Sequence, residues 1–239
     1  MTARRTDTTK EEIDEFASFG VRAFTTTRDA GTFGLSGADP VGEVLARWTA
    51  LEHELARDAR ALVIGRQVHS ARVIAHHAGW EGFLRTGEAD GHVTSEKGIA
   101  LSVSVADCVP VFMAHPSGTV AILHSGWRGT AARIIDPGLD AFVRAGMLLD
   151  ELLIHLGPAI CGSCYEVSAD VLTQMTGIPA SRPGTVDIRS LIADHAKERG
   201  VTRITISEFC TRCDNGRFFS HRAGDTGRQV AVIVASRSG

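Results

Sequence analysis

Residues 101–124 constrain the fold of this chain more than any other segment. Residues 101–114 alternate between apolar and small or polar side chains, as half-buried strands do, and residues 119–124 also have strand composition. Between the two runs lies His-Pro-Ser-Gly, a sequence typical of a turn. The segment therefore predicts a β-hairpin, which excludes a purely parallel sheet.

The hairpin brings two metal-binding residue types together. If the turn centres on the Pro-Ser pair, opposed residue numbers sum to about 233, so Cys108 faces His124 or Ser125 at a Cβ separation of roughly 5 Å. A third candidate, His69, lies upstream in Arg-Gln-Val-His-Ser. One thiolate and two imidazoles form a zinc ligand set with one position left open. A thiolate–imidazole pair without metal is the alternative use of Cys108 and His124.

Apolar periodicity predicts a mixture of helices and strands in the rest of the chain. The helix expected at 41–60 places Val44, Leu45, Trp48, Leu51 and Leu55 on one face. Further helices are expected at 126–135, 138–145, 169–176 and 188–199, and strands at 19–28, 61–75 (two pieces with a bend near residue 69), 152–156, 203–206 and 229–235.

This pattern predicts an α+β, or mixed α/β, fold in which mixed β-sheets carry flanking helices. We expect residues 16–239 to form a single domain. Residues 1–15 are polar and charged, and are expected to form a flexible N-terminal arm.

Composition narrows the class of function. The net charge of -3 provides no basic surface for nucleic acid, and no apolar run reaches the length of a membrane span. The polar N-terminus lacks the apolar stretch of a signal peptide, and five cysteines are an odd count, so we expect a cytoplasmic protein with reduced thiols or metal-bound cysteines. Small molecules are the expected partners.

Two CxxC pairs form a second metal signal. They are Cys161 with Cys164 and Cys210 with Cys213. Such pairs often build a closed structural zinc site, but here the pairs are much farther apart than in a compact zinc ribbon. Free thiols are therefore the favoured expectation, with a four-cysteine zinc site and a redox pair as alternatives.

Two segments have the composition of a substrate-binding surface. Gly-Trp-Arg-Gly follows the hairpin and contains Arg128, whose guanidinium suits an anionic or planar ligand. A Gly-bounded segment, 217–228, combines two phenylalanines with His221 and Arg222. It is either a solvated turn between core strands or a substrate wall in which aromatic rings stack and arginine meets phosphate.

With these residues in view, the chain resembles the laccase-domain family, also called the multicopper polyphenol oxidase-like family. The resemblance covers about residues 60–232 and rests on these matching segments: Gln67-Val68-His69, Ala89-Asp90-Gly91, Ala106-Asp107-Cys108-Val109-Pro110, His124-Ser125-Gly126-Trp127-Arg128-Gly129-Thr130, Gly157-Pro158-Ala159-Ile160, Cys164-Tyr165-Glu166-Val167, Phe218-Phe219-Ser220-His221-Arg222 and Thr226-Gly227-Arg228.

The resemblance implies a catalytic zinc held by His69, Cys108 and His124. It implies a purine nucleoside phosphorylase that converts adenosine, inosine, guanosine and methylthioadenosine to base and pentose 1-phosphate, and that also deaminates adenosine through activated water. Arg28 aligns with the family's N-terminal Thr-Thr-Arg and is expected, with Arg128, His221 and Arg222, to contact substrate. A monomer or homodimer is expected.

The chain departs from the family pattern in three places. Ser125 stands where alanine is usual, Ala223 where a second arginine is usual, and residues 29–60 are divergent. Three alternatives therefore stay open: copper-dependent phenol oxidation, a cysteine hydrolase using Cys108 and His124, and a non-catalytic metal-binding protein. Copper oxidation is the weakest on physical grounds, because a blue-copper centre plus a copper cluster needs more clustered histidines than the sequence shows.

Overall fold

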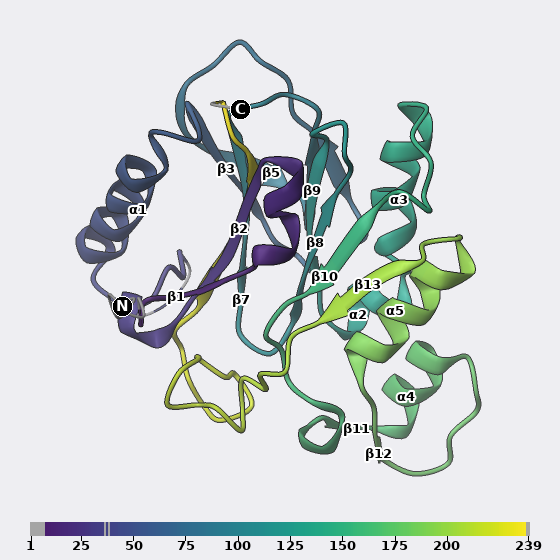
Figure 1. Ribbon diagram of the computed structural model, residues 1–239. Coiled ribbons are helices and arrows are strands. Elements are labelled where there is room, and N and C mark those ends of the chain that lie inside the picture. Colours follow the sequence, from purple (N-terminus) through teal and green to yellow (C-terminus); the bar gives the residue numbers. More distant parts are fainter. Residues whose placement is uncertain (1–7, 36, 38, 238–239) are drawn as a thin grey trace, which may run out of the picture.

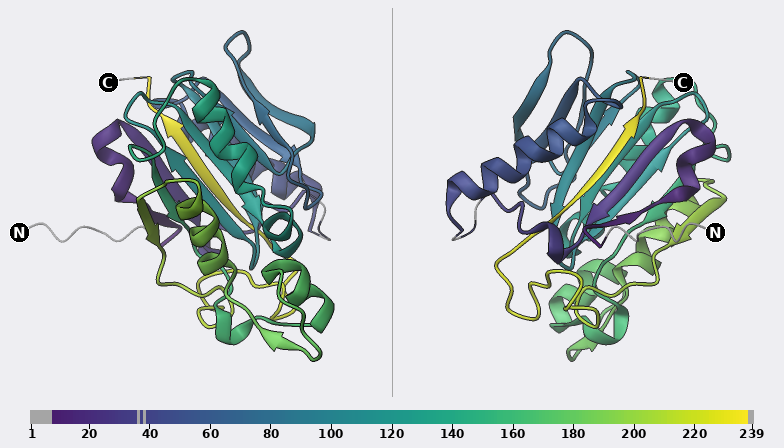
Figure 2. Two further views of the ribbon diagram at one scale, coloured as in Figure 1. Left: turned by 90° about the vertical axis from the view of Figure 1, so that its right-hand side faces the viewer. Right: turned by 60° about the vertical axis from the view of Figure 1, so that its left-hand side comes forward.

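Two six-stranded mixed β-sheets pack face to face in the computed structural model, which describes residues 8–35, 37 and 39–237 (Figure 1). Helix α1 (Val41–Leu55) covers the outer face of the first sheet. Helices α3 (Ile135–Arg144) and α5 (Ile188–Glu198) cover the outer face of the second sheet (Figure 2). These layers confirm the predicted mixed α/β class, with mixed sheets and flanking helices.

The first sheet has the strand order β1-β2-β14-β7-β3-β5. Strand β3 is parallel to both of its neighbours, and the other pairs are antiparallel. Along the central strand β14, Val230 and Val232 face α1, whereas Ala231 and Ile233 face the second sheet, which explains why the strand is apolar at every position. The strands are β1 (Lys10–Glu12), β2 (Val21–Thr26), β3 (Ala61–Arg66), β5 (Gly82–Glu88), β7 (Ile99–Val105) and β14 (Gln229–Ala235).

The second sheet has the order β13-β10-β8-β9-β6-β4, and its outermost pair at each edge is parallel. Its strands are β4 (Val73–Ala75), β6 (Gly91–Thr94), β8 (Val109–Ala114), β9 (Val120–Ser125), β10 (Leu153–Leu156) and β13 (Arg203–Ile206). A small antiparallel pair, β11 (Glu166–Val167) with β12 (Gly184–Thr185), lies beyond it. The sequence did not indicate β5, β6 or this pair.

The predicted hairpin is formed by β8 and β9, but its register differs by one residue from the expectation. Val109 lies opposite Ser125, and Pro110 lies opposite His124. The turn spans residues 115–118 and is closed by a hydrogen bond from the Gly118 amide to the His115 carbonyl. Glycine supplies the positive φ of 88° required at position 118.

The run of residues 101–114 is not one strand, which corrects the prediction. It divides into β7 and β8, which belong to different sheets, and the chain crosses between them at residues 106–108. Asp107 has a φ of 78° at this crossing, a conformation that aspartate tolerates better than most residues. Cys108 therefore lies at the crossing, immediately before β8.

The chain near the N-terminus also differs from the expected flexible arm. Residues 1–7 lie outside the described part of the chain. Lys10–Glu12 pairs with β2, and a 3-10 helix, η1 (Asp14–Phe19), follows it. Ile13 and Phe16 are buried in the core between the sheets, so this part of the expected arm packs against the domain.

The predicted helices are present with small changes of length. Helix α1 ends at Leu55, before the expected residue 60, and Leu45 is 47% exposed although the periodicity placed it on the buried face. The helices expected after the hairpin are α2 (Trp127–Ala131) and α3, and α4 (Ala169–Thr176) has the predicted bounds. Short 3-10 turns, η2 (Arg28–Ala30) and η3 (Gly162–Cys164), complete the elements. Every helix in the described residues is too short or too polar to span a membrane.

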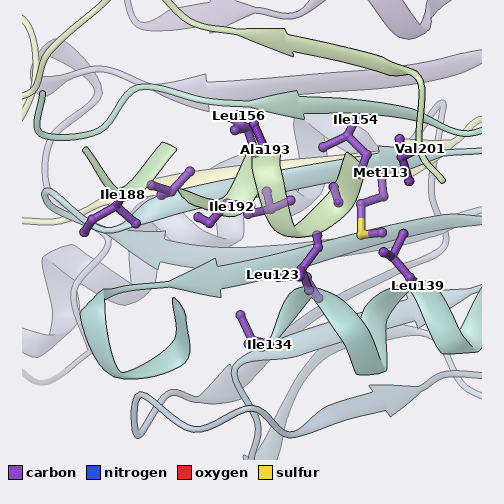
Figure 3. Close-up of a cluster of buried hydrophobic side chains, with 14 of the residues drawn as sticks. Met113, Leu123, Ile134, Leu139, Ile154, Leu156, Ile188, Ile192, Ala193 and Val201 are labelled. Atoms are coloured by element: carbon purple, nitrogen blue, oxygen red, sulfur yellow. The ribbon is translucent and has the colours of Figure 1, made fainter. Parts of the chain in front are cut away.

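Helices α3 and α5 are held on the second sheet by a cluster of buried aliphatic side chains (Figure 3). Leu123 of β9 and Ile154 of β10 point to the helices, and Leu139 and Ile192 point back to the sheet. Burying one such side chain stabilises the fold by about 1.5–3 kcal/mol. Gly138 lets α3 approach closely, because a Cβ there would lie 3.0 Å from a methyl carbon of Leu123. Strand β9 is thereby held firmly on its outer side.

Candidate metal centre and pocket

The three predicted metal ligands meet at one end of the two-sheet sandwich. His69, Cys108 and His124 each offer one ligand atom, and these atoms all lie within 4.8 Å of one another. His69 comes from the bend between β3 and β4, where its φ is 60°. Side chains alternate along β9, so Leu123 faces α3 while His124 lies on the side of the inter-sheet core. The tertiary structure thus assembles the cluster from three separate segments.

A buried carboxylate orients two of these ligands. Asp90 is fully buried just before β6 and accepts a hydrogen bond from His124 Nδ1 at 2.8 Å. It also accepts bonds from the backbone amides of Val68, His69 and Ser70 at 3.1, 2.9 and 2.7 Å. The bond to Nδ1 leaves Nε2 of His124 for a metal, the usual arrangement of a carboxylate behind a ligating histidine. Asp90 was visible in the sequence only as part of the Ala-Asp-Gly match.

The charges in the cluster shift one another's pKa values. Burial by itself would raise the pKa of Cys108, but the charge of His124 and hydrogen bonds with His124 and His69 lower it to about 6. Burial would lower the pKa of His124, yet the Cys108 thiolate and Asp90 raise it to about 9. For Asp90, hydrogen bonds from His124 and Ser70 outweigh burial and lower the pKa to about 2. Without metal, a thiolate–imidazolium pair is therefore favoured near neutral pH.

Gly126 leaves room for the cluster. A Cβ at this position would lie 2.7 Å from Cys108 Sγ and 3.2 Å from a ring carbon of His69. Any side chain would therefore displace two of the ligands. The close approach is the physical reason for glycine directly after β9.

Asp107 ties the cluster to the loop between β13 and β14. Its Oδ1 accepts a hydrogen bond from the Thr211 hydroxyl at 2.6 Å, and its Oδ2 accepts one from the Arg222 amide at 2.6 Å. Both partners belong to that loop, which lies beside the lower ends of the sheets in Figure 1. The residue before Cys108 thus positions the segment that contains His221.

The cluster opens into a pocket of about 420 Å³. The pocket lies where β3, β7 and β9 end, and it combines the three candidate ligands with cationic, amide, hydroxyl and apolar groups. The residues beside the ligands are Phe33, Gly34, Leu35, Gly37, Ile64, Gly65, Arg66, Gln67, Arg85, Ser104, Ala106, His221, Thr226 and Arg228. This volume is in the range of small-molecule sites.

Of the four expected substrate contacts, His221 lines the pocket and three arginines do not. Arg28 instead binds the β13–β14 loop, with a 2.6 Å ion pair to Asp225 and its guanidinium over the Phe219 ring. Its Nε and Nη2 groups are therefore bonded within the protein, and a contact between Arg28 and substrate stays a prediction.

The other two arginines also have protein partners. The guanidinium of Arg128 lies over the ring of Trp127, 4.3 Å from its centroid. Arg222 donates to the Glu166 carbonyl at 2.9 Å and lies over Tyr165. Both lie outside the pocket lining, and their contact with substrate stays a prediction.

Three arginines that the sequence did not single out do line the pocket. Arg66 is paired with Glu88, and Arg228 donates to carbonyl groups of its own loop. The side chain of Arg85, on β5, forms no hydrogen bond or ion pair with the other described residues. The sequence signals were the position of Arg66 beside His69 and the presence of Arg228 in segment 217–228. Arg85 had no such signal and reaches the pocket through the sheet arrangement alone.

The second metal signal is also brought together. Cys161, Cys164, Cys210 and Cys213 offer sulfur atoms within 4.8 Å of one another, and no disulfide joins any of the cysteines. In the described part of the chain, this group and the histidine–cysteine cluster are the two sets of residues that could hold a metal ion.

Comparison with known proteins identifies the family of the chain. The family model described as "Multi-copper polyphenol oxidoreductase laccase" matches residues 23–236. "Purine nucleoside phosphorylase ORF3" of Streptomyces griseus is 32% identical over 209 residues, with 84% of each chain covered. "Adenosine deaminase RL5", from an unknown prokaryotic organism, is 33% identical over 238 residues, which cover 85% of this chain and 88% of the relative.

Solved structures show the same fold. The hypothetical protein YfiH of Bacillus licheniformis has a TM-score of 0.86 at 25% identity, with 97% of this chain and 98% of that chain covered. YlmD of Geobacillus stearothermophilus has a TM-score of 0.82 at 29% identity, with 91% and 93% covered. These likenesses and the family match confirm the resemblance found in the sequence. The chain belongs to the multi-copper polyphenol oxidoreductase laccase family.

Proposed function

We propose that the protein is a zinc-dependent purine nucleoside phosphorylase that also deaminates adenosine. The proposed substrates are adenosine, inosine, guanosine or methylthioadenosine, with phosphate as the second substrate of phosphorolysis. The observation that carries the proposal is a three-ligand cluster at the base of an open pocket with three arginines in its wall. Relatives named purine nucleoside phosphorylase and adenosine deaminase support it.

The donor set fits zinc. His69, Cys108 and His124 supply two imidazoles and one thiolate, and three protein ligands with an open fourth position are typical of catalytic zinc sites. Asp90 holds His124 so that Nε2 is free, and Gly126 leaves space beside Cys108. When bound, zinc would supply a Lewis acid that activates water.

The pocket residues have separate proposed roles. In phosphorolysis a phosphate oxygen forms a bond to C1′ of the pentose while the bond from C1′ to the purine nitrogen breaks, and the departing base takes up a proton. Arg85 is proposed to hold the phosphate, because its charge has no partner among the other described residues. His221 is proposed to hydrogen-bond to the purine.

The first test combines metal analysis with turnover. Protein purified without added metal is analysed for zinc, and adenosine is incubated with and without phosphate while adenine, inosine and ribose 1-phosphate are separated by chromatography. His69→Ala is expected to lose the zinc of this cluster and both products. His53→Ala changes an exposed histidine on α1 and is the matched control, expected to retain both. Zinc bound at this cluster with no product from the wild type would refute the enzyme and favour a non-catalytic metal-binding protein.

A cysteine hydrolase is the second candidate, and one observation favours it. The pKa of Cys108 is lowered to about 6 by its contact with His124, as in a nucleophilic thiolate–imidazole pair. Alkylation of Cys108 with and without zinc separates the two proposals. Protection by zinc, with activity that depends on zinc, would exclude the hydrolase.

Copper-dependent phenol oxidation has the support of the family description. It requires a blue-copper centre together with a further copper cluster. The described residues contain two groups of possible metal ligands. One consists of four cysteines, and the other contains two histidines, which are too few for both copper centres. Phenol oxidation that needs stoichiometric copper and is lost in His69→Ala would favour this reading, and oxidation that persists in that variant would identify it as an artefact of added copper.

A further inference from the structure

The two CxxC segments leave the same end of the second sheet. Strands β10 and β13 are parallel neighbours, with Leu156 paired to Ile206 at their final residues. The segment after β10 contains Cys161 and Cys164, and the segment after β13 contains Cys210 and Cys213. Figure 1 shows both segments at the lower end of these strands. The parallel pairing therefore brings together residues that are 49 positions apart in the chain.

The spacing of the four sulfur atoms suits one tetrahedral ion. All four lie within 4.8 Å of one another, and Cys164 Sγ is 3.5 Å from Cys213 Sγ. Four sulfurs at about 2.3 Å from a zinc ion are about 3.8 Å from one another. Only small side-chain movements separate the cluster from this geometry. A disulfide would instead need a sulfur–sulfur distance of about 2.05 Å.

Backbone amides are directed at one of the sulfurs. Cys210 Sγ accepts hydrogen bonds from the amides of Cys161 and Cys213 at 3.3 and 3.4 Å. Cys210 is 5% exposed, and a buried thiolate needs such donors or a cation. One amide from each CxxC segment thus donates to a sulfur of the cluster, and hydrogen-bond donors of this kind orient the ligands of metal ions.

We propose that Cys161, Cys164, Cys210 and Cys213 bind one zinc ion in a closed structural site. Four thiolates leave no position for substrate, so the site would stabilise structure and carry out no catalysis. This proposal does not depend on the proposed enzymatic function, because it uses none of the residues of the pocket.

The structural zinc would support the wall behind the pocket. Thr211, within the second CxxC segment, bonds to the Asp107 side chain, and its amide donates to Ala159. The Ile160 amide, next to Cys161, donates to the Asp107 carbonyl at 3.1 Å. Both CxxC segments therefore hold Asp107, which precedes Cys108 and binds the Arg222 amide. Loss of the zinc is expected to loosen this connection.

The test measures zinc per chain in variants of each site. The wild type is expected to contain about two zinc ions per chain, and His69→Ala about one. The double variant Cys164→Ser with Cys213→Ser is expected to contain about one, and its combination with His69→Ala close to none. These two cysteines are chosen because they are more exposed than Cys210, so the variant is expected to fold. Ser18→Ala, at an exposed position on η1 away from both clusters, is the control and should match the wild type.

Cobalt substitution and thiol counting give independent readouts. In the His69→Ala background, cobalt bound at this cluster is expected to show the intense visible absorption of a tetrahedral cobalt–thiolate centre, and zinc is expected to protect the four thiols from a thiol reagent until a chelator is added. Free reaction of all the thiols in the folded, zinc-supplied protein would overturn the proposal. So would a disulfide between Cys164 and Cys213, or iron in place of zinc. An inactive wild type that holds zinc here would refute only the enzymatic function.

Discussion

Replacing Asp90 with asparagine tests how far one buried carboxylate organises the candidate metal centre. Oδ1 accepts from the His69 amide and His124 Nδ1, and Oδ2 accepts from the Val68 amide and from both the amide and the hydroxyl of Ser70. Asparagine keeps one of these acceptors and directs an NH₂ group at the donors of the other. At least two donors would therefore lose their partner.

The cost can be worked from the pKa of Asp90. A folded value of about 2 against an ordinary 3.8 corresponds to about 2 kcal/mol at neutral pH, at 1.36 kcal/mol per unit. Each buried donor without a partner costs a further 1–3 kcal/mol or so. We expect Asp90→Asn to lower the free energy of unfolding by at least about 4 kcal/mol. Zinc affinity should fall roughly 10- to 100-fold, as for other lost partners of ligating histidines.

The sign of the pH dependence follows from the lowered pKa. The contribution of the carboxylate is fully present above the unfolded pKa of about 4 and is lost as the pH falls through the folded pKa of about 2. The difference between wild type and Asp90→Asn should therefore be constant above about pH 4 and become smaller below it. This range applies to the metal-free protein, in which stability and metal affinity can be measured separately.

The assay is denaturant unfolding of chelator-treated protein, followed by zinc titration against a chromophoric chelator. Asp150→Asn is the matched control, because the Asp150 side chain is exposed and only its carbonyl accepts a hydrogen bond. The control should differ from the wild type by less than about 0.5 kcal/mol. If Asp90→Asn were equally close to the wild type and bound zinc with unchanged affinity, the assigned role of this carboxylate would be refuted.

Three further predictions concern the ligands and the pocket. In metal-free protein, the alkylation rate of Cys108 should rise with increasing pH with a midpoint near pH 6, because the charge of His124 lowers the pKa of the thiol. A midpoint near pH 9 would contradict the thiolate–imidazolium pair. Gly126→Ala should weaken zinc binding, since its Cβ would lie 2.7 Å from the sulfur, whereas Gly42→Ala, with open space around it, should have no effect on binding. Arg85→Ala should raise the KM for phosphate about tenfold, because roughly one charge-assisted hydrogen bond is lost. The control Arg57→Ala changes an exposed position outside the pocket and should leave this KM unchanged. Equal KM values for the two variants would refute the assigned phosphate contact.

The candidate ligands could be found in the sequence because local geometry carries much of the information. A turn between two strand-like runs places Cys108 near His124 within a short stretch of chain, and the structure confirms that the two side chains meet. The argument succeeded although the register was shifted by one and Cys108 lies before β8. Side chains at a hairpin's open end have enough reach to tolerate such an error.

Asp90 and the pocket arginines could not be assigned in this way. Asp90 binds groups from the β3–β4 bend and from β9, and only the packing of these segments shows that its carboxylate has five donors. Arg28 illustrates the same limit. It has the charge of a phosphate ligand, but Asp225 lies close enough to neutralise it. Charge type is visible in a sequence, whereas the partner of a charge depends on contacts between distant segments.

The sequence alone determined the fold class, the central hairpin and most helices, because apolar periodicity and turn chemistry act over short stretches of chain. It also determined the three residues of the candidate metal centre. Only the tertiary structure decided that residues 101–114 divide between two sheets at Asp107, and that parallel pairing of β10 with β13 joins the two CxxC segments. The physical reason is that sheet partners and loop contacts are chosen by burial across the whole chain, which no local pattern encodes.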